Sequence, residues 1–100
     1  MSPRIAVDRQ KIAEFCRRHH IRKLSLFGSV LTERFGPDSD VDFLVEFEPG
    51  QGSGYLGLAR MERELSDLVG RRVDLRTPLE LSRYFRDEVL AGASVQYSQA

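Results

Sequence analysis

Several kinds of residue and segment are scarce in this 100-residue sequence, and each scarcity excludes a class of protein. A single cysteine, Cys16, excludes an internal disulfide and a cysteine-based zinc site. Fifteen basic and fifteen acidic residues leave no net charge. This balance disfavours direct nucleic-acid binding as the main task, because such binding usually needs a basic excess. It also weakens colloidal solubility, so we expect a protein partner with which the chain could form an oligomer.

Long apolar runs are also missing. No stretch approaches the roughly 20 apolar residues that a membrane-spanning helix needs. The opening residues, MSPRIAVDRQ, lack the apolar segment that is typical of a secretory signal. We therefore expect a cytoplasmic protein that makes no membrane contact. The chain length and its 41% apolar content predict one globular domain over residues 1–100.

The spacing of the apolar residues predicts alternating helices and short strands. Helices are expected over residues 8–20, 30–34, 55–69 and 78–92, and strands over 22–27, 40–47, 72–76 and 94–97. The strand over 40–47 is apolar on both faces apart from its acids, which places it centrally in the sheet. The predicted fold class is therefore α/β, in the α+β sense of a small mixed β-sheet flanked by helices.

Some conspicuous residues have structural interpretations. Cys16 and Met61 lie on the apolar stripes of their helices, so we expect both in the core. His19 and His20 close the first helix, where an imidazolium complements the helix dipole. The glycine-rich segment 48–54, EPGQGSG, lacks the Gly-Lys-Ser/Thr of a phosphate-binding loop, so we interpret it as a flexible connection.

Two carboxylates at the head of an apolar strand indicate a cation site. Alternate side chains share a face of a strand, so Asp40 and Asp42 project together while Val41 points away. Burying them is costly unless a positive charge neutralises them. Asp74 interrupts another apolar strand, and it would complete a three-carboxylate cluster if that strand lay beside the first. Such a cluster suits Mg²⁺, which prefers a few carboxylates together with water and phosphate oxygens.

The pair Gly28-Ser29 ends the first strand and offers a place for phosphate. Gly28 lets the backbone approach a ligand without an intervening side chain. Ser29 begins the expected short helix, so its hydroxyl and the N–H groups that follow could hold a phosphate. A phosphate cradle beside one or two metal ions is the equipment for phosphoryl or nucleotidyl transfer.

The spacing of these residues resembles a known signature. Gly28-Ser29, ten further residues and Asp40-Val41-Asp42 resemble the signature of the DNA polymerase β-like nucleotidyltransferase superfamily. The wider run GSVLTERFGPDSDVDFLVEF and the later VDLRTP resemble the minimal nucleotidyltransferases of the MNT (MntA-like) group. The resemblance covers about residues 23–97 and implies the nucleotidyltransferase fold. It also implies ATP as the donor and two Mg²⁺ ions, with Asp40, Asp42 and Asp74 as catalytic metal ligands and Gly28 and Ser29 on the phosphates.

Members of this group are commonly the antitoxins of two-component toxin–antitoxin modules. The resemblance therefore implies a protein adenylyltransferase that transfers AMP from ATP to a tyrosine of a HEPN-domain RNase toxin and so neutralises it. The chain departs from the group at one place. Many members have Ala-Arg-Gly where this sequence has Leu31, Thr32 and Glu33, and Arg34 is a candidate replacement for the missing arginine.

The partner would have to present the acceptor, because 100 residues leave no room for a separate substrate domain. We expect the partner to contact the last helix, where Tyr84, Phe85 and Leu90 offer apolar surface, and the loop near Gly52. Those aromatic residues could equally belong to the core, and we place Phe85 there.

Three other functions compete with this interpretation. The chain could neutralise its partner by binding and masking it without catalysis, although an idle site would be free to lose its costly acids. It could modify a small molecule, although no substrate-binding domain is evident. It could also be a regulatory α/β module in which the motif occurs by coincidence.

Overall fold

The secondary structure follows the alternation that the apolar spacing predicts. The computed structural model describes residues 5, 7–52 and 54–99. Its elements are α1 (Arg9–Arg18), β1 (Ile21–Phe27), the 3₁₀ helix η1 (Gly28–Leu31), β2 (Val41–Phe47), α2 (Tyr55–Val69), β3 (Val73–Arg76), the 3₁₀ helix η2 (Pro78–Glu80), α3 (Arg83–Gly92) and β4 (Ser94–Ser98). No helix in the described part of the chain is long and apolar enough to cross a membrane.

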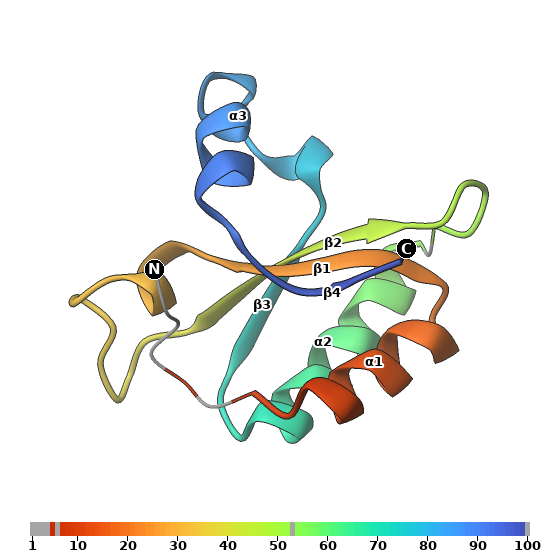
Figure 1. Ribbon diagram of the computed structural model, residues 1–100, viewed down its shortest axis with the longest axis horizontal. Helices are drawn as coiled ribbons and strands as arrows, with labels where there is room; N and C mark the ends of the chain where they lie inside the picture. Colours follow the sequence, from red (N-terminus) through yellow and green to blue (C-terminus); the bar gives the residue numbers. More distant parts are fainter. Residues whose placement is uncertain (1–4, 6, 53, 100) are drawn as a thin grey trace.

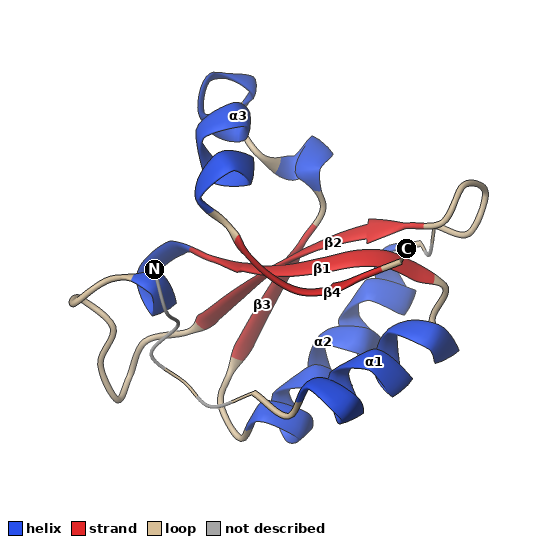
Figure 2. Cartoon of the chain, viewed as in Figure 1, coloured by secondary structure: helices blue, strands red, loops and turns tan. Residues whose placement is uncertain are grey.

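The four strands form one mixed sheet in the order β3-β2-β1-β4 (Figure 2). The central strand β2 runs antiparallel to β1 and parallel to β3, and β1 pairs with β4 in antiparallel fashion. The predicted α+β class and the central place of the 40–47 strand are therefore confirmed.

One face of the sheet packs on α1 and α2. These two helices contact each other and lie together on one side of the sheet (Figure 1). Asp8 begins α1 by accepting hydrogen bonds from the backbone N–H groups of Gln10 and Lys11. Gly70, in the left-handed conformation, ends α2. The buried apolar core consists of Ile12, Phe15, Cys16, Ile21, Leu24, Leu26, Val30, Leu31, Val41, Phe43, Val45, Met61, Leu65, Val73 and Leu75.

The core positions of Cys16 and Met61 are as predicted, since both side chains are buried. Burial raises the pKa of the Cys16 thiol to about 12, which keeps it protonated and unreactive. His19 forms the C-cap of α1, and its Nε2 lies 3.1 Å from Glu64 Oε1 on α2. This histidine therefore connects the two helices of the core face.

The expected helix over 78–92 is broken into two parts. Leu81 has an extended backbone between η2 and α3, and the Ser82 hydroxyl restarts the helix by accepting a hydrogen bond from the N–H of Tyr84. The Arg86 side chain donates hydrogen bonds to the carbonyl oxygens of Pro78 and Leu81. The Arg86 side chain thus spans the break, and the Pro78 carbonyl accepts this bond in addition to the one from the N–H of Leu81 at 3.2 Å.

The prediction that Phe85 lies in the core is wrong. Its side chain is 61% exposed, and Tyr84 and Leu79 are exposed at 78% and 83%. No residue of α3 is buried, and α3 stands away from α1 and α2 (Figure 1). Since α1 and α2 already cover the core face of the sheet, Tyr84 and Phe85 of α3 stay exposed in the described part of the chain.

Candidate functional site

The second face of the sheet carries Asp42 and Asp74 side by side. In the parallel register of β2 and β3, Asp42 pairs with Asp74, one step along from the buried pair Val41 and Val73. Because side chains alternate along a strand, both carboxylates point away from α1 and α2. The expectation that the 72–76 strand lies beside the 40–47 strand, which brings Asp74 to Asp42, is confirmed.

Gly28 lies directly against Asp42. The backbone of Gly28 has a φ of +79°, in the left-handed region that favours glycine, and a Cβ there would overlap Asp42 Oδ2. Phe27, the residue before it, is the cross-strand partner of Asp42. The end of β1 and the start of β2 therefore lie side by side, which brings Gly28 next to Asp42.

The electrostatics of Asp42 show an excess of negative charge. Its pKa is raised to about 6, first by burial and then by repulsion from Asp74 and Asp40, while Arg76 opposes the shift. A cation at this point would relieve both the repulsion and the cost of burial. The donor set, carboxylate oxygens at the mouth of a half-buried face, is the type that Mg²⁺ takes.

Asp74 has a basic neighbour that the sequence analysis did not single out. The Nε and Nη2 atoms of Arg76 donate hydrogen bonds of 3.2 Å and 3.1 Å to Asp74 Oδ2, and this contact raises the pKa of Arg76. The signal was available, because residues two apart in a strand share a face.

Asp40 stands just outside the strand. Its side chain is 45% exposed, and it forms a long ion pair of 3.8 Å with the exposed Arg72. Within residues 5, 7–52 and 54–99, no group of three His, Cys, Asp or Glu side chains is arranged to hold a metal ion. Asp40 and Asp74 each lie near enough to repel Asp42, but the predicted cluster is not assembled in advance.

The helix expected over 30–34 is instead the four-residue 3₁₀ helix η1, which starts at Gly28. Such a short helix has little dipole, so any phosphate contact at Ser29 depends on individual N–H and hydroxyl groups. Thr32 closes this turn. Its hydroxyl donates to the Ser29 carbonyl at 2.9 Å and accepts from the N–H of Arg34 at 3.2 Å.

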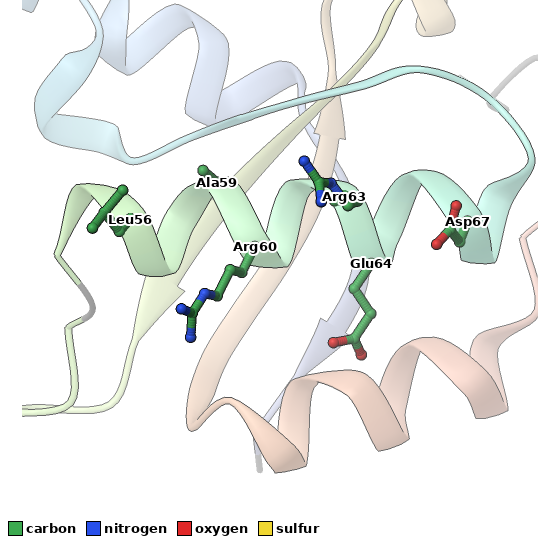
Figure 3. Close-up of a pocket in the computed structure, with 6 residues that line it drawn as sticks. All are labelled: Leu56, Ala59, Arg60, Arg63, Glu64 and Asp67. Carbon is green, nitrogen blue, oxygen red and sulfur yellow. The ribbon is translucent and has the colours of Figure 1, made fainter.

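Hollows border the carboxylates on two sides. One of about 250 Å³ at the free edge of β3 is lined in part by Asp74, Arg76 and Glu62. Another of about 210 Å³ is lined in part by Asp40 and Arg71. A larger hollow of about 450 Å³ lies along α2 and is lined by Leu56, Ala59, Arg60, Arg63, Glu64 and Asp67 (Figure 3). All of its lining residues come from one helix on the other side of the sheet, so it is not part of the carboxylate site.

A methyl group at Gly28 should disturb the site beyond its effect on the backbone. Gly28→Ala and Gly70→Ala both place alanine at a left-handed φ, +79° and +71°, and each should cost about 1–2 kcal/mol of stability. Only the first would displace the Asp42 carboxylate, because open space surrounds Gly70. Electron paramagnetic resonance should show Mn²⁺ binding at least about 10-fold weaker in Gly28→Ala than in Gly70→Ala. Equal binding by the two variants would contradict this placement.

The raised pKa of Asp42 predicts a pH-dependent stability. Without metal, the folded protein holds this proton more tightly than the unfolded chain, whose ordinary pKa is 3.8. Ionisation of Asp42 therefore lowers the free energy of unfolding. This loss grows as the pH rises from about 4 to about 6. Asp42→Asn should raise the melting temperature in EDTA, with a gain that grows through this window and then levels off. The exposed Asp67→Asn should show no such growth, and a gain for Asp42→Asn that is independent of pH would contradict the assignment.

Comparison with known proteins identifies the family. A family model described as a nucleotidyltransferase domain matches residues 9–95. A protein of Methanocaldococcus jannaschii, provisionally named a protein adenylyltransferase, is 33% identical over 82 residues, which make up 82% of this chain and 86% of that protein. A solved structure provisionally described as a minimal nucleotidyltransferase is 36% identical, with a TM-score of 0.70, and the match covers 85% of both chains.

Two toxin–antitoxin structures share the fold at lower identity. A toxin–antitoxin complex with AMP-PNP has a TM-score of 0.74 at 18% identity, over 93% of this chain and 75% of that chain. A complex of a tri-AMPylated Shewanella oneidensis HEPN toxin with its MNT antitoxin has a TM-score of 0.66 at 18% identity, over 91% and 70%. The family model spans most of this chain, and the archaeal relative is matched over most of its length. The chain therefore belongs to the nucleotidyltransferase domain family, as its sequence resemblance predicts.

Proposed function

We propose that this chain is a Mg²⁺-dependent protein adenylyltransferase that acts as an antitoxin. Its substrates would be ATP and a tyrosine of a cognate HEPN-domain RNase toxin, and the reaction would take place in the cytoplasm. The observation that carries the proposal is the register pairing of Asp42 with Asp74 against the Cβ-free backbone of Gly28.

Each residue of the site has a role in this proposal. Asp40, Asp42 and Asp74 would hold Mg²⁺, two ions in the full site, and Gly28 and Ser29 would face the phosphates of ATP. The metal would supply Lewis-acid chemistry there, lowering the pKa of the attacking hydroxyl and neutralising charge on the leaving pyrophosphate. The repulsion that raises the pKa of Asp42 supports this assignment, because a cation would remove it.

The reaction is a displacement at the α-phosphorus of ATP. The phenolic oxygen of the acceptor tyrosine forms a bond to that phosphorus, and the bond from phosphorus to the bridging oxygen of the β-phosphate breaks. Pyrophosphate leaves with the electron pair of this bond, and the phenol proton passes to solvent. The part of the protein is to align the two oxygens, with the carboxylates on β2 and β3 on one side and the Gly28 backbone on the other.

The names of the compared proteins support the substrates proposed here. The archaeal relative carries the adenylyltransferase name, and the toxin of the Shewanella oneidensis complex is AMPylated while an MNT antitoxin is bound to it. The AMP-PNP in another toxin–antitoxin structure is an analogue of the donor proposed for this chain.

The partner would dock on the apolar side of η2 and α3. Leu79, Tyr84 and Phe85 are exposed there, and α3 leads into β4 at one edge of the sheet while η2 follows β3 at the other. This surface therefore adjoins the face that carries the carboxylates. The same exposed surface favours one second candidate, an antitoxin that neutralises its partner by masking alone.

Transfer of label decides between these two functions. The protein, Mg²⁺ and ATP labelled at the α-phosphate are incubated with the product of the adjacent gene. We expect label on a tyrosine of that partner, located by mass spectrometry, and its loss in Asp42→Ala but not in the exposed Asp67→Ala. If the double variant Asp40→Ala/Asp42→Ala neutralises the partner fully and no label is transferred by the wild type, the masking function replaces the proposed one.

The docking surface is tested by a change that should spare the fold. Phe85→Ser should leave the unfolding free energy within about 0.5 kcal/mol of wild type, because the side chain is exposed. The same change should weaken partner binding at least about 10-fold, as expected for an aromatic residue at the centre of an interface. Leu56→Ser, which alters an exposed leucine of α2, is the matched control and should bind normally. Equal affinities for the two variants would place the interface elsewhere.

A further inference from the structure

Arg71, in the turn between α2 and β3, binds the backbone of residues 36–39, which lie more than thirty residues earlier in the sequence. Its Nη2 atom donates hydrogen bonds to three carbonyl oxygens, those of Gly36 at 2.8 Å, Pro37 at 3.2 Å and Ser39 at 2.9 Å. Its guanidinium carbon lies 4.5 Å from the centre of the Phe35 ring. A planar guanidinium can stack and donate at the same time, which a lysine cannot do.

The segment that Arg71 holds connects the two halves of the candidate site. It runs from the end of η1, beside Gly28 and Ser29, to the start of β2. Two local hydrogen bonds close its turn, from the N–H of Ser39 to the Gly36 carbonyl and from the N–H of Gly36 to the Ser39 hydroxyl. Those bonds shape the turn but do not attach it to the rest of the protein. The backbone bond from the N–H of Val41 to the Arg72 carbonyl, 2.8 Å long, holds the end of the segment, and the bonds from Arg71 attach residues 36–39 to the turn that precedes β3.

Asp40 depends on this segment more than the other two carboxylates do. Asp42 lies within β2 between two paired strands, and Asp74 is paired with it in β3 and bonded to Arg76. Asp40 precedes the strand, and among the described residues its half-exposed side chain forms one ion pair, the 3.8 Å contact to Arg72. Its placement is therefore set by the main chain that enters β2, and Asp40 and Arg71 line the same hollow.

We propose that Arg71 is a positioning residue for Asp40. It fixes the 35–39 backbone so that Asp40 is presented to a metal ion beside Asp42 and Asp74. This inference rests on the proposed function, since it assigns Asp40 to the metal. Arg71 would touch neither the metal nor the nucleotide. Its loss would lower metal affinity by loosening the loop over residues 35–39.

The test uses two readouts on the full chain. Arg71→Ala, Arg71→Lys and the control Arg60→Ala, which changes an exposed arginine of α2, are compared with wild type. Amide hydrogen exchange of residues 35–40 in metal-free protein reports the order of the loop, with the β1 and β2 amides as an internal standard for the fold. Calorimetric titration with Mn²⁺ reports the affinity of the site. If Arg71→Ala does not fold, Arg71→Gln takes its place.

We expect faster exchange over residues 35–40 and Mn²⁺ affinity lower by about 10-fold or more in Arg71→Ala, as for other residues that orient metal ligands. Arg71→Lys should recover part of both, and Arg60→Ala should match wild type. Unchanged loop exchange in Arg71→Ala would overturn the proposal, as would a loosened loop with unchanged Mn²⁺ affinity. A wild type that binds no Mn²⁺ would instead count against the proposed metal-dependent function, while the exchange data still decide whether Arg71 holds the loop.

Discussion

The parallel pairing of β2 with β3 is the constraint on which the site depends. It sets Asp42 beside Asp74, and the ladder prevents these like charges from moving apart. The energetic result is a pKa of about 6 for Asp42, caused by burial, then by Asp74, then by Asp40. The apolar partners on the other face of the same strands, such as Val41 and Val73, are buried under α1 and α2. Packing of the core therefore keeps Asp42 and Asp74 adjacent although their charges repel each other. Natural proteins tolerate such local costs at functional sites when the rest of the fold is stable.

Three arginines from the β3 side contact the carboxylates or the backbone next to them, each in a different way. Arg76 bonds directly to Asp74, Arg72 reaches Asp40 at long range, and Arg71 holds the backbone that carries Asp40. All three are close in sequence to Asp74, so β3 and its preceding turn supply both a carboxylate and the groups that control its neighbours. Arg76 is thus the counter-ion of Asp74 in the metal-free site. A cation that entered the site would compete with Arg76 for this carboxylate.

Much of this arrangement could be predicted from the sequence, for physical reasons that apply residue by residue. Period-two alternation predicts strands for Asp42 and Asp74, and both lie in strands, whereas Asp40, predicted to begin the 40–47 strand, lies one residue before β2. Gly28 contacts the Asp42 side chain, and the predicted approach of its backbone to a phosphate stays a prediction. The break at Leu81 was missed because it depends on Arg86 bonding to the carbonyls of the broken turn. Phe85 is predicted in the core but is exposed, because the sequence does not show that α1 and α2 already cover the apolar face of the sheet. Arg71 gave no signal, since its acceptors are backbone carbonyls more than thirty residues earlier.

The central claim is that Asp42 and Asp74 flank a metal-dependent nucleotide site at Gly28. The most direct measurement is a crystal structure of the protein with Mn²⁺ and a non-hydrolysable ATP analogue, with anomalous scattering used to locate the manganese. The account predicts a manganese peak bound by Asp42 and Asp74, with Asp40 as a further ligand and the triphosphate against Gly28 and Ser29. Manganese and nucleotide bound elsewhere, such as the hollow along α2, with Asp74 still bonded to Arg76, would contradict it.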